Sequence, residues 1–302
     1  MSFCSGKQGN GMSLEGLRKN TDLFRCPICS GSMKVENNKS LVCAGGHCFD
    51  LSKNGYVNFL LHPIRTDYNK AMLQARNRIL EGGFFLPLAQ QICEIAGEEI
   101  DFSAREPIRV LDAGCGEGTF LAQTAGCLRG LAAADIIGAG MDLSKEGIRI
   151  ASGRHPGFLW CVGDLANCPF MDGKMDIILN ILSPSNYGEF HRLLTDGGLL
   201  IKVVPGSDYL KELRAAFYDH TDKQTYSNER VFRHFRENFH LSGTKRIRYP
   251  VEMNKESLED LIRMTPLSWN ASHEKIQEAR NSGIDSVTVD MTVMIGKNSS
   301  VV

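Results

Sequence analysis

The sequence predicts an α/β fold, a mostly parallel doubly wound sheet, preceded by a small metal-binding unit. Two observations indicate it. Between residues 105 and 205, apolar segments alternate with stretches of helical character, and the first apolar segment runs into a glycine-rich turn. Such alternation places helices on both faces of a parallel sheet. Earlier in the chain, four cysteines and one histidine lie within 23 residues, between Cys26 and Cys48.

Length and composition set the class of protein. A chain of 302 residues can bury one sizeable core and carry a small second unit. A hydrophobic content of 42% and a charged content of 23% are ordinary for a soluble globular protein. Residues 1–20 contain no apolar run typical of a signal peptide, and no later segment has the ~20 apolar residues of a membrane span. We therefore expect a reducing cytoplasm, where cysteines serve as thiols or metal ligands.

The net charge of −1 hides an asymmetry along the chain. Residues 1–80 carry 11 Lys and Arg against 5 Asp and Glu, whereas the remainder carries 23 against 30. A basic front part is compatible with a polyanionic partner, and a solvated charged surface is the simpler alternative.

The cysteine-rich segment has the spacing of a zinc site. Cys26 and Cys29 form a Cys-x2-Cys pair, and thirteen residues later Cys43 and His47 form Cys-x3-His. Zinc takes four such donors in a tetrahedron, and four protein donors close the site, as in structural zinc. Cys48 is the rival fourth ligand because it is adjacent to His47. Few apolar residues lie between 21 and 62, so metal binding would supply much of the folding free energy of this zinc-ribbon-like unit.

A glycine-rich turn forms the second signal. Ile108 to Ala113 is typical of a buried strand, Gly114, Gly116 and Gly118 follow, and a helix is expected from about Thr119. Glycines allow the tight turn, and the free helix N-terminus faces a ligand. Asp112 precedes the turn, where a carboxylate would repel a pyrophosphate but tolerate a cation. The pattern therefore favours S-adenosylmethionine over a dinucleotide.

Acidic residues end the next two predicted strands. One strand ends at Asp142, where a carboxylate can accept hydrogen bonds from two ribose hydroxyls, and a third ends near Asp164, placed to meet the adenine amino group. A fourth and a fifth strand are expected at residues 175–182 and 197–205. Three acids on successive strand ends predict a Rossmann-like class I methyltransferase domain.

These stretches together resemble the 23S ribosomal RNA (guanine-N1)-methyltransferase family over about residues 24–297. The resemblance rests on "CPIC…CAGGHCFDLSKNGYVNFLL", "MLQARNRILEGGFFLPL", "VLDAGCGEGTF", "VVPGSDYLKEL" and "LIRMTPLSW". It implies a small zinc domain joined to a methyltransferase domain with a mostly parallel seven-stranded sheet. It also implies methylation of a guanine in a hairpin loop of domain II of 23S rRNA, near the peptide exit tunnel. Some branches of the family confer resistance to certain macrolides.

The resemblance assigns site residues in this sequence. One structural Zn²⁺ is expected on Cys26, Cys29, Cys43 and His47. Phe85 stands where some members have Tyr, and Tyr209 stands where some have His. The cofactor-binding residues expected from the pattern and the resemblance together are Phe85, Asp112, Gly114, Gly116, Glu117, Asp142, Leu143, Asp164, Leu165 and Tyr209.

The acceptor side is expected after the fourth strand. Guanine N1 carries a proton at neutral pH, so a base must accept it. Asn180 could hydrogen-bond the guanine edge and Tyr187 could stack on it. A capped loop at residues 181–188 that packs its own side chains is the alternative. The base itself could be water or a carboxylate such as Asp164.

The expected organisation has four parts. These are a flexible tail (1–20), a zinc-binding domain (21–62), a linker and helix (63–92) and the methyltransferase domain (93–302). Lys70, Arg76 and Arg78 in the linker, and a basic stretch at residues 211–248, could hold phosphates of an rRNA hairpin. No membrane partner is expected, and a homodimer is left open. The alternatives are a small-molecule methyltransferase, another RNA base methyltransferase, or a non-catalytic RNA-binding protein.

Overall fold

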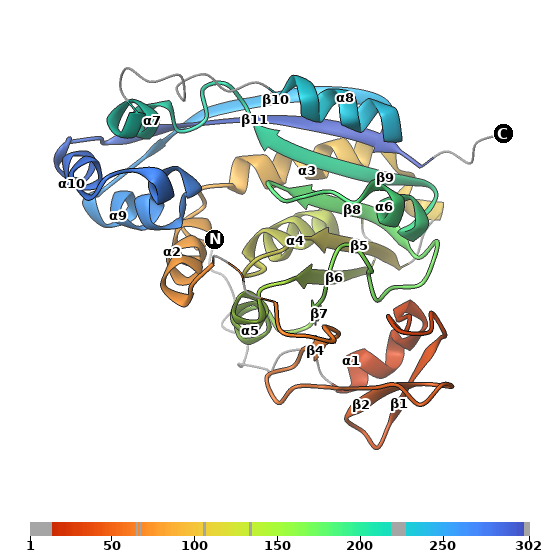
Figure 1. The fold of residues 1–302 in the computed structure, drawn as a ribbon. Coiled ribbons are helices and arrows are strands. Elements are labelled where there is room, and N and C mark those ends of the chain that lie inside the picture. Colours follow the sequence, from red (N-terminus) through yellow and green to blue (C-terminus); the bar gives the residue numbers. More distant parts are fainter. Residues whose placement is uncertain are drawn as a thin grey trace.

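An eight-stranded sheet runs through the computed structural model, which describes residues 14–64, 66, 68–104, 107–132, 135–218 and 228–298 (Figure 1). From edge to edge the strands are β10 (His240–Glu252), β11 (Ser286–Lys297), β9 (Leu194–Pro205), β8 (Met175–Ile181), β5 (Ile108–Ala113), β6 (Ile136–Asp142), β7 (Leu159–Val162) and β4 (Val57–Asn58). The strands from β9 to β4 are parallel, and β11 runs antiparallel to both of its neighbours. The predicted mostly parallel α/β sheet is confirmed.

The eighth strand is the difference from the seven-stranded sheet expected from the sequence. β4 has two residues and comes from the segment assigned to the zinc domain. Val57 pairs with Cys161 and Asn58 with Val162, parallel to β7. This strand extends the sheet edge, so the N-terminal unit shares a sheet with the methyltransferase domain.

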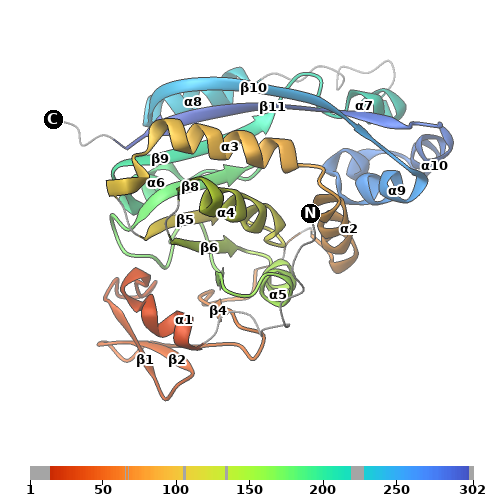
Figure 2. The ribbon, with the colours of Figure 1, turned by 180° about the vertical axis from the view of Figure 1, so that it is seen from behind.

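Helices cover both faces of the sheet (Figures 1 and 2). They are α2 (Lys70–Glu81), α3 (Leu86–Glu99), α4 (Thr119–Ala132), α5 (Lys145–Arg154), α6 (Tyr187–Leu193), α7 (Lys211–Tyr218), α8 (Glu229–Asn238), α9 (Lys255–Met264) and α10 (His273–Asn281), with short 3-10 helices η1 (Thr21–Leu23), η2 (Phe102–Ala104) and η4 (Pro266–Asn270). Side-chain caps begin several of them: Asn69 accepts a hydrogen bond from Met72 N at α2, and Ser144 from Gly147 N at α5. None of the described helices has the length and apolar character that a membrane crossing needs.

Successive side chains of the central strands point to opposite faces, as the pleat requires. Val110 of β5 and Ile177 of β8 pack with α3, α4 and α5, whereas Leu111 and Ile178 pack on the face that carries α6 and α8. Both faces are buried, which explains the near-continuous apolar runs of these strands in the sequence.

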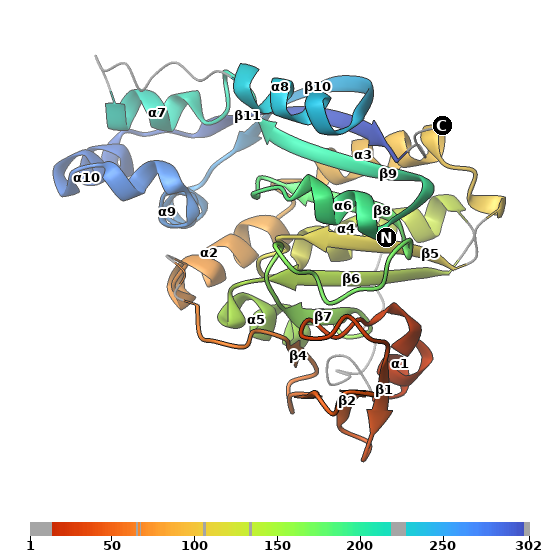
Figure 3. The same ribbon diagram turned by 45° about the vertical axis from the view of Figure 1, so that its right-hand side comes forward.

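The N-terminal unit lies at the β7–β4 end of the sheet, far from β10 and β11 (Figure 3). Its own small antiparallel sheet consists of β1 (Met33–Glu36), β2 (Ser40–Cys43) and β3 (Cys48–Asp50). The ring of Phe24 lies 5.9 Å from that of Phe59 and 5.7 Å from that of Phe170 in the methyltransferase domain. The zinc-binding unit is thus docked through a shared aromatic core, and Leu23, Leu41 and Phe49 of this unit are buried in the same apolar cluster.

The predicted flexible tail at residues 1–20 differs from the structure over its second part. Residues 1–13, with Cys4, lie outside the described ranges. Residues Leu14–Lys19 form a short helix, α1, whose Leu17 is fully buried. Leu17 belongs to the same apolar cluster as Phe24 and Phe170, so burial of this one side chain gives the helix a reason to form.

The shared aromatic core yields a stability prediction. Phe24→Ala removes a fully buried ring between two others, so the free energy of unfolding should fall by about 3–5 kcal/mol in urea denaturation. Ile28→Ala is the matched control, because Ile28 is 47% exposed. A loss below about 1 kcal/mol in Phe24→Ala would show that the two units do not depend on each other.

Candidate functional site

The four predicted zinc donors come together. The Sγ atoms of Cys26, Cys29 and Cys43 and a ring nitrogen of His47 all lie within 4.8 Å of one another. The Cys29–Cys43 Sγ separation is 3.5 Å, and His47 Nδ1 lies 3.5 Å from Cys26 Sγ and 3.3 Å from Cys43 Sγ. Tetrahedral zinc with its usual bond lengths places such donors about 3.5–3.8 Å apart. The set therefore fits one Zn²⁺ with no position left for substrate.

Two tight turns present these donors. In the first, Ser30 N donates to Cys26 O and Ser30 adopts a φ of 60°. In the second, Gly46 N donates to Cys43 O and Gly46 has a φ of 79°. Cys48 lies outside the cluster, exposed on β3 with its Sγ 4.0 Å from Asp50 Oδ1. His47 is the better fourth ligand.

The glycine turn joins β5 to α4 at the carboxyl end of the parallel strands. Gly114 has a φ of 90° and Gly118 a φ of 81°, values that other residues rarely adopt. A Cβ at Gly114 would lie 2.6 Å from Ser183, and one at Gly118 would lie 2.4 Å from the ring of Trp160. Both positions therefore require glycine.

Asp142 ends β6 and faces the turn. Its Oδ2 accepts a hydrogen bond of 2.9 Å from Gly116 N, and its Oδ1 accepts one of 2.7 Å from Ser144 N. Burial raises the pKa of Asp142, and these two backbone donors act against that rise. Each carboxylate oxygen keeps a second lone pair, so ribose hydroxyls can still donate to it.

Buried charge surrounds the turn. Arg76 Nε of α2 donates to Glu117 Oε2 at 3.0 Å, and Glu117 is fully buried. Among the described atoms, Glu117 Oε1 and Asp112 Oδ1 are buried without a hydrogen-bond partner. Burial raises the pKa of Asp112 to about 8, and Arg76 opposes that rise. The carboxyl groups of Asp112, Glu117 and Asp142 thus share one nearby cation, the Arg76 guanidinium. A cationic ligand such as S-adenosylmethionine therefore fits this site better than a pyrophosphate.

A smaller cavity of about 280 Å³ opens beside the turn. Its lining includes several predicted cofactor residues: Gly114, Gly116, Asp142, Leu143, Asp164 and Leu165. Phe85 lies elsewhere, fully buried with its ring 5.0 Å from Phe84 and 6.4 Å from Phe120. Tyr209 lines the neighbouring larger cavity, where burial raises the pKa of its phenol to about 12.

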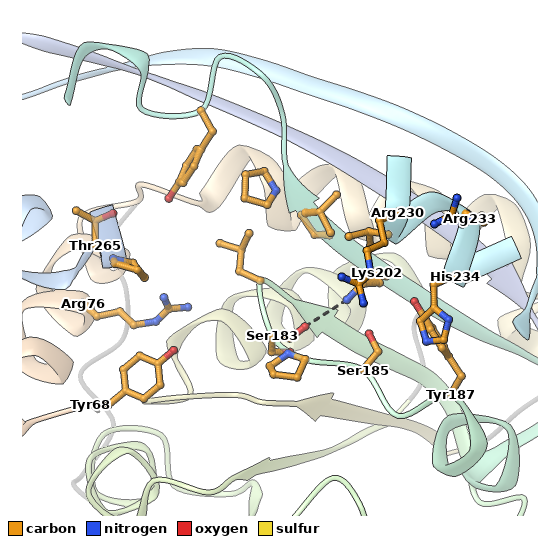
Figure 4. Close-up of a pocket in the computed structure, with 18 of the residues that line it drawn as sticks. Tyr68, Arg76, Ser183, Ser185, Tyr187, Lys202, Arg230, Arg233, His234 and Thr265 are labelled. Atoms are coloured by element: carbon orange, nitrogen blue, oxygen red, sulfur yellow. Dashed lines mark hydrogen bonds between the residues drawn. The ribbon is translucent and has the colours of Figure 1, made fainter. Parts of the chain in front are cut away.

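The larger cavity, about 670 Å³, shares the wall of the smaller one (Figure 4). Residues 182–184, here called the dividing loop, line both cavities, as do Tyr68 and Arg76. The charged and ionisable residues of the larger cavity are Tyr68, Arg76, Tyr187, Lys202, Tyr209, Arg230, Arg233, His234 and Glu237. Cations predominate, which suits a polyanionic ligand.

Asn180, near the end of β8, holds the dividing loop through hydrogen bonds. Its Nδ2 donates to Ala113 O at 3.1 Å, Ser183 Oγ at 2.6 Å and Pro184 O at 2.8 Å. Its Oδ1 accepts from Ser185 Oγ at 2.8 Å and Lys202 Nζ at 2.7 Å. The side chain is fully buried, and these partners occupy both its hydrogens and both its lone pairs. The geometry favours the capped-loop alternative over contact with a guanine edge.

Tyr187 begins α6 and is largely buried. Its ring lies 5.1 Å from His234, 5.8 Å from Phe235 and 6.1 Å from Phe190. Burial raises the pKa of its phenol. Tyr187 and His234 line the larger cavity, but most of the Tyr187 ring is buried against its aromatic neighbours.

Two of the three predicted phosphate contacts of the linker form ion pairs within the protein, whereas the third, Lys70 at the start of α2, is exposed. Arg78 makes a bidentate pair with Asp260 of α9, at 2.7 and 2.6 Å, and Arg76 pairs with Glu117. Arg76 instead belongs to the wall of both cavities. Its helix turns it inward, since residues 76 and 78 do not share a helical face.

Sequence reasoning missed Lys202, whereas Arg230 and Arg233 of α8 fall within the basic stretch 211–248 expected to hold phosphates. Lys202 interrupts the apolar run "LLIKVV" of β9, and a lone lysine in a buried strand was the signal that could have found it. Arg230 and Arg233 fall three residues apart on α8 and so share a face. The sequence of α8 alone does not predict that this face lines the larger cavity.

Two family profiles match the chain. One, a zinc ribbon described as "RlmA, N-terminal", matches residues 24–66, and another, described as "Methyltransferase domain", matches residues 110–198. The first range holds the four zinc donors and β4. The second holds the glycine turn, both strand-end acids and the dividing loop.

Two curated relatives match over most of their length, and a third matches over about half. A Bacillus subtilis (strain 168) protein, provisionally named a 23S rRNA (guanine-N(1)-)-methyltransferase, is 43% identical over 276 residues, covering 91% of this chain and 96% of the relative. A Streptomyces fradiae protein named 23S rRNA (guanine(748)-N(1))-methyltransferase is 29% identical over 284 residues, covering 92% and 98%. A malonyl-acyl-carrier protein O-methyltransferase from Laribacter hongkongensis (strain HLHK9) is 30% identical over 166 residues, covering 49% and 54%.

The closed donor set predicts stoichiometric zinc. Purified protein should contain about one zinc per chain by elemental analysis, and Cys43→Ser should lose it because three donors hold the ion poorly. Cys48→Ser is the matched control and should keep the metal. Full zinc content in Cys43→Ser would refute the ligand assignment.

The affinity for the cofactor should depend on the Asp142 carboxylate. Asp142→Ala should weaken S-adenosylmethionine binding by about 2–3 kcal/mol in calorimetry, because two charge-assisted hydrogen bonds to ribose are lost. Glu274→Ala, on exposed α10, serves as the control. Unchanged affinity in Asp142→Ala, or tight binding of NAD by the unaltered protein, would contradict the pocket assignment.

Proposed function

This chain belongs to the family of 23S rRNA (guanine-N1)-methyltransferases, and from that premise we propose that it transfers a methyl group from S-adenosylmethionine to N1 of a guanine in a hairpin loop of domain II of 23S rRNA. The larger cavity is the observation that carries this proposal. It adjoins the cofactor cavity across one loop, and the charged side chains in its lining are mostly cations. A small apolar acceptor would have little use for such a lining.

The smaller cavity holds the cofactor, whose sulfonium supplies an electrophilic methyl group. Asp142 accepts hydrogen bonds from the ribose, and Asp164 accepts one from the adenine amino group. Leu143 and Leu165 cover the adenine faces, since both line this cavity. Glu117 brings negative charge to the cationic end of the cofactor, and a bound cation would favour the ionised form of Asp112 as well. The unpartnered buried oxygens of both residues support this role.

The target guanine enters the larger cavity as a flipped-out base. Unpaired loop bases can leave the stack at a cost of a few kcal/mol, which aromatic contacts offset. Tyr68 is 44% exposed and Trp269 is 46% exposed, and their rings lie 5.9 Å apart in an edge-on arrangement. Tyr68 lines the larger cavity, and Trp269 lies beside it. This exposed pair is suited to stacking on bases that flank the target.

Arg230 and Arg233 of α8 bind backbone phosphates next to the flipped base. Both line the larger cavity, and both are exposed. They replace Arg76 and Arg78 of the linker as the phosphate contacts we assign, because those two arginines are already paired with carboxylates.

Asn180 positions the dividing loop and Tyr187 supports the cavity wall. Asp164 is assigned to the cofactor, because it lines the smaller cavity. One copy of the chain supplies both cavities, and the homodimer stays open. We place the activity in the cytoplasm, where rRNA is modified, and methylation near the exit tunnel would make macrolide susceptibility a cellular readout.

The product defines the test. With an rRNA fragment that contains the domain II hairpin and tritiated cofactor, nucleoside mass spectrometry should find 1-methylguanosine. Arg233→Glu should weaken RNA binding at least tenfold and lower its salt dependence, since each neutralised phosphate adds about 0.7–0.9 to the log–log slope. Cofactor affinity should stay the same.

Lys255→Glu, on the exposed start of α9, is the control and should bind RNA normally. A methyl group at another guanine position, methylation of a small molecule alone, or unchanged RNA binding in Arg233→Glu would each refute part of this proposal.

A further inference from the structure

Lys202 is a lysine placed in the middle of a buried strand. Its neighbours on β9, Ile201 and Val203, are fully buried, and Lys202 itself is 5% exposed. The side chain of Lys202 lines the larger cavity. A buried lysine is costly, so the position calls for a chemical reason.

Two hydrogen bonds fix the orientation of the Lys202 amine. Nζ donates to Asn180 Oδ1 at 2.7 Å and to Ser183 O at 3.2 Å. Figure 4 shows the second of these bonds. A neutral primary amine has two hydrogens and one lone pair. Two acceptors held by the protein use both hydrogens, and the lone pair then remains for a third partner on the cavity side.

The surroundings favour the neutral amine. Within the described ranges, no carboxylate forms an ion pair with Lys202. The other groups that face the cavity are the cations Arg76, Arg230 and Arg233, the imidazole of His234 and the phenols of Tyr68, Tyr187 and Tyr209, with Glu237 as the one acid. Burial lowers the pKa of the Lys202 amine to about 8. A minor fraction of the amine is therefore unprotonated at neutral pH, and this fraction grows as the pH rises towards 8.

Lys202 also lies at the boundary of the two cavities. Ser183, its second acceptor, belongs to the dividing loop that lines both of them. A methyl donor in the smaller cavity can meet a base in the larger one beside this loop. The acceptor nitrogen must come to the same place as the amine.

We propose that Lys202 is the catalytic base that removes the N1 proton of the acceptor guanine. The inference rests on the proposed function. As the N1 nitrogen forms its bond to the methyl carbon, the bond from that carbon to the sulfonium sulfur breaks and its electron pair stays on sulfur. The N1 proton moves to the lone pair of Lys202 Nζ. The resulting ammonium ion releases the proton to water after the product leaves.

The first test measures the amine itself without any reaction. In protein labelled at the lysine Cε with carbon-13, the Cε shift of Lys202, assigned by its loss in Lys202→Met, should titrate with a midpoint near 8. Exposed lysines should titrate near 10.4. A Lys202 midpoint above 10 would overturn the proposal.

The second test separates a base from a fixed positive charge. Single-turnover formation of 1-methylguanosine should rise tenfold per pH unit below pH 8 and then level off in the unaltered protein. Lys202→Met should lower the rate at pH 7.5 by about 10²–10⁴-fold and lose the levelling. Lys202→Arg should be equally slow, because a guanidinium stays charged.

Cofactor affinity in both variants should remain within twofold of the unaltered protein, and Lys255→Met should react normally. Restored activity in Lys202→Arg would show that a cation suffices, and normal activity in Lys202→Met would show that another group takes the proton. Both results would refute the base. Absence of 1-methylguanosine with the unaltered protein would instead refute the proposed function.

Discussion

The side-chain amide of Asn180 is the contact on which both cavities depend. It ties the end of β5, through Ala113 O, to the dividing loop and to Lys202 of β9. Leu182, in that loop, has a φ of 54°, which is unfavourable for a leucine. The amide fixes the loop ends and so offsets this strain. Without it, one wall would no longer separate the methyl donor from the acceptor base.

Electrostatics on the two sides of this wall are opposite. The glycine turn is surrounded by Asp112, Glu117 and Asp142, with Arg76 as the shared cation. The larger cavity carries Arg230 and Arg233 instead. A cationic cofactor and a polyanionic RNA are therefore attracted to different sides of the dividing loop. Arg76 lines both cavities.

The sequence predicts what local geometry determines. Strand periodicity, the three glycines and the strand-end acids place the sheet and the smaller cavity, and Cys-x2-Cys with Cys-x3-His places the zinc donors. It fails where partners come from distant segments. Whether Asn180 faces a substrate or five protein atoms depends on β5, β9 and the following loop together. Phe85 is buried in a ring cluster for the same reason, and Arg76 is turned inward by α2 onto Glu117. Two residues of β4 and one buried leucine in α1 carry too little local signal to be predicted.

The central claim is that donor and acceptor meet at the dividing loop beside Lys202. A crystal structure with S-adenosylhomocysteine and guanosine monophosphate tests it most directly. We expect the thioether sulfur in the smaller cavity and guanine in the larger one, with N1 within about 3.2 Å of Lys202 Nζ. Guanine bound with its N1 edge turned away from Lys202, or the thioether sulfur in the larger cavity, would contradict the account.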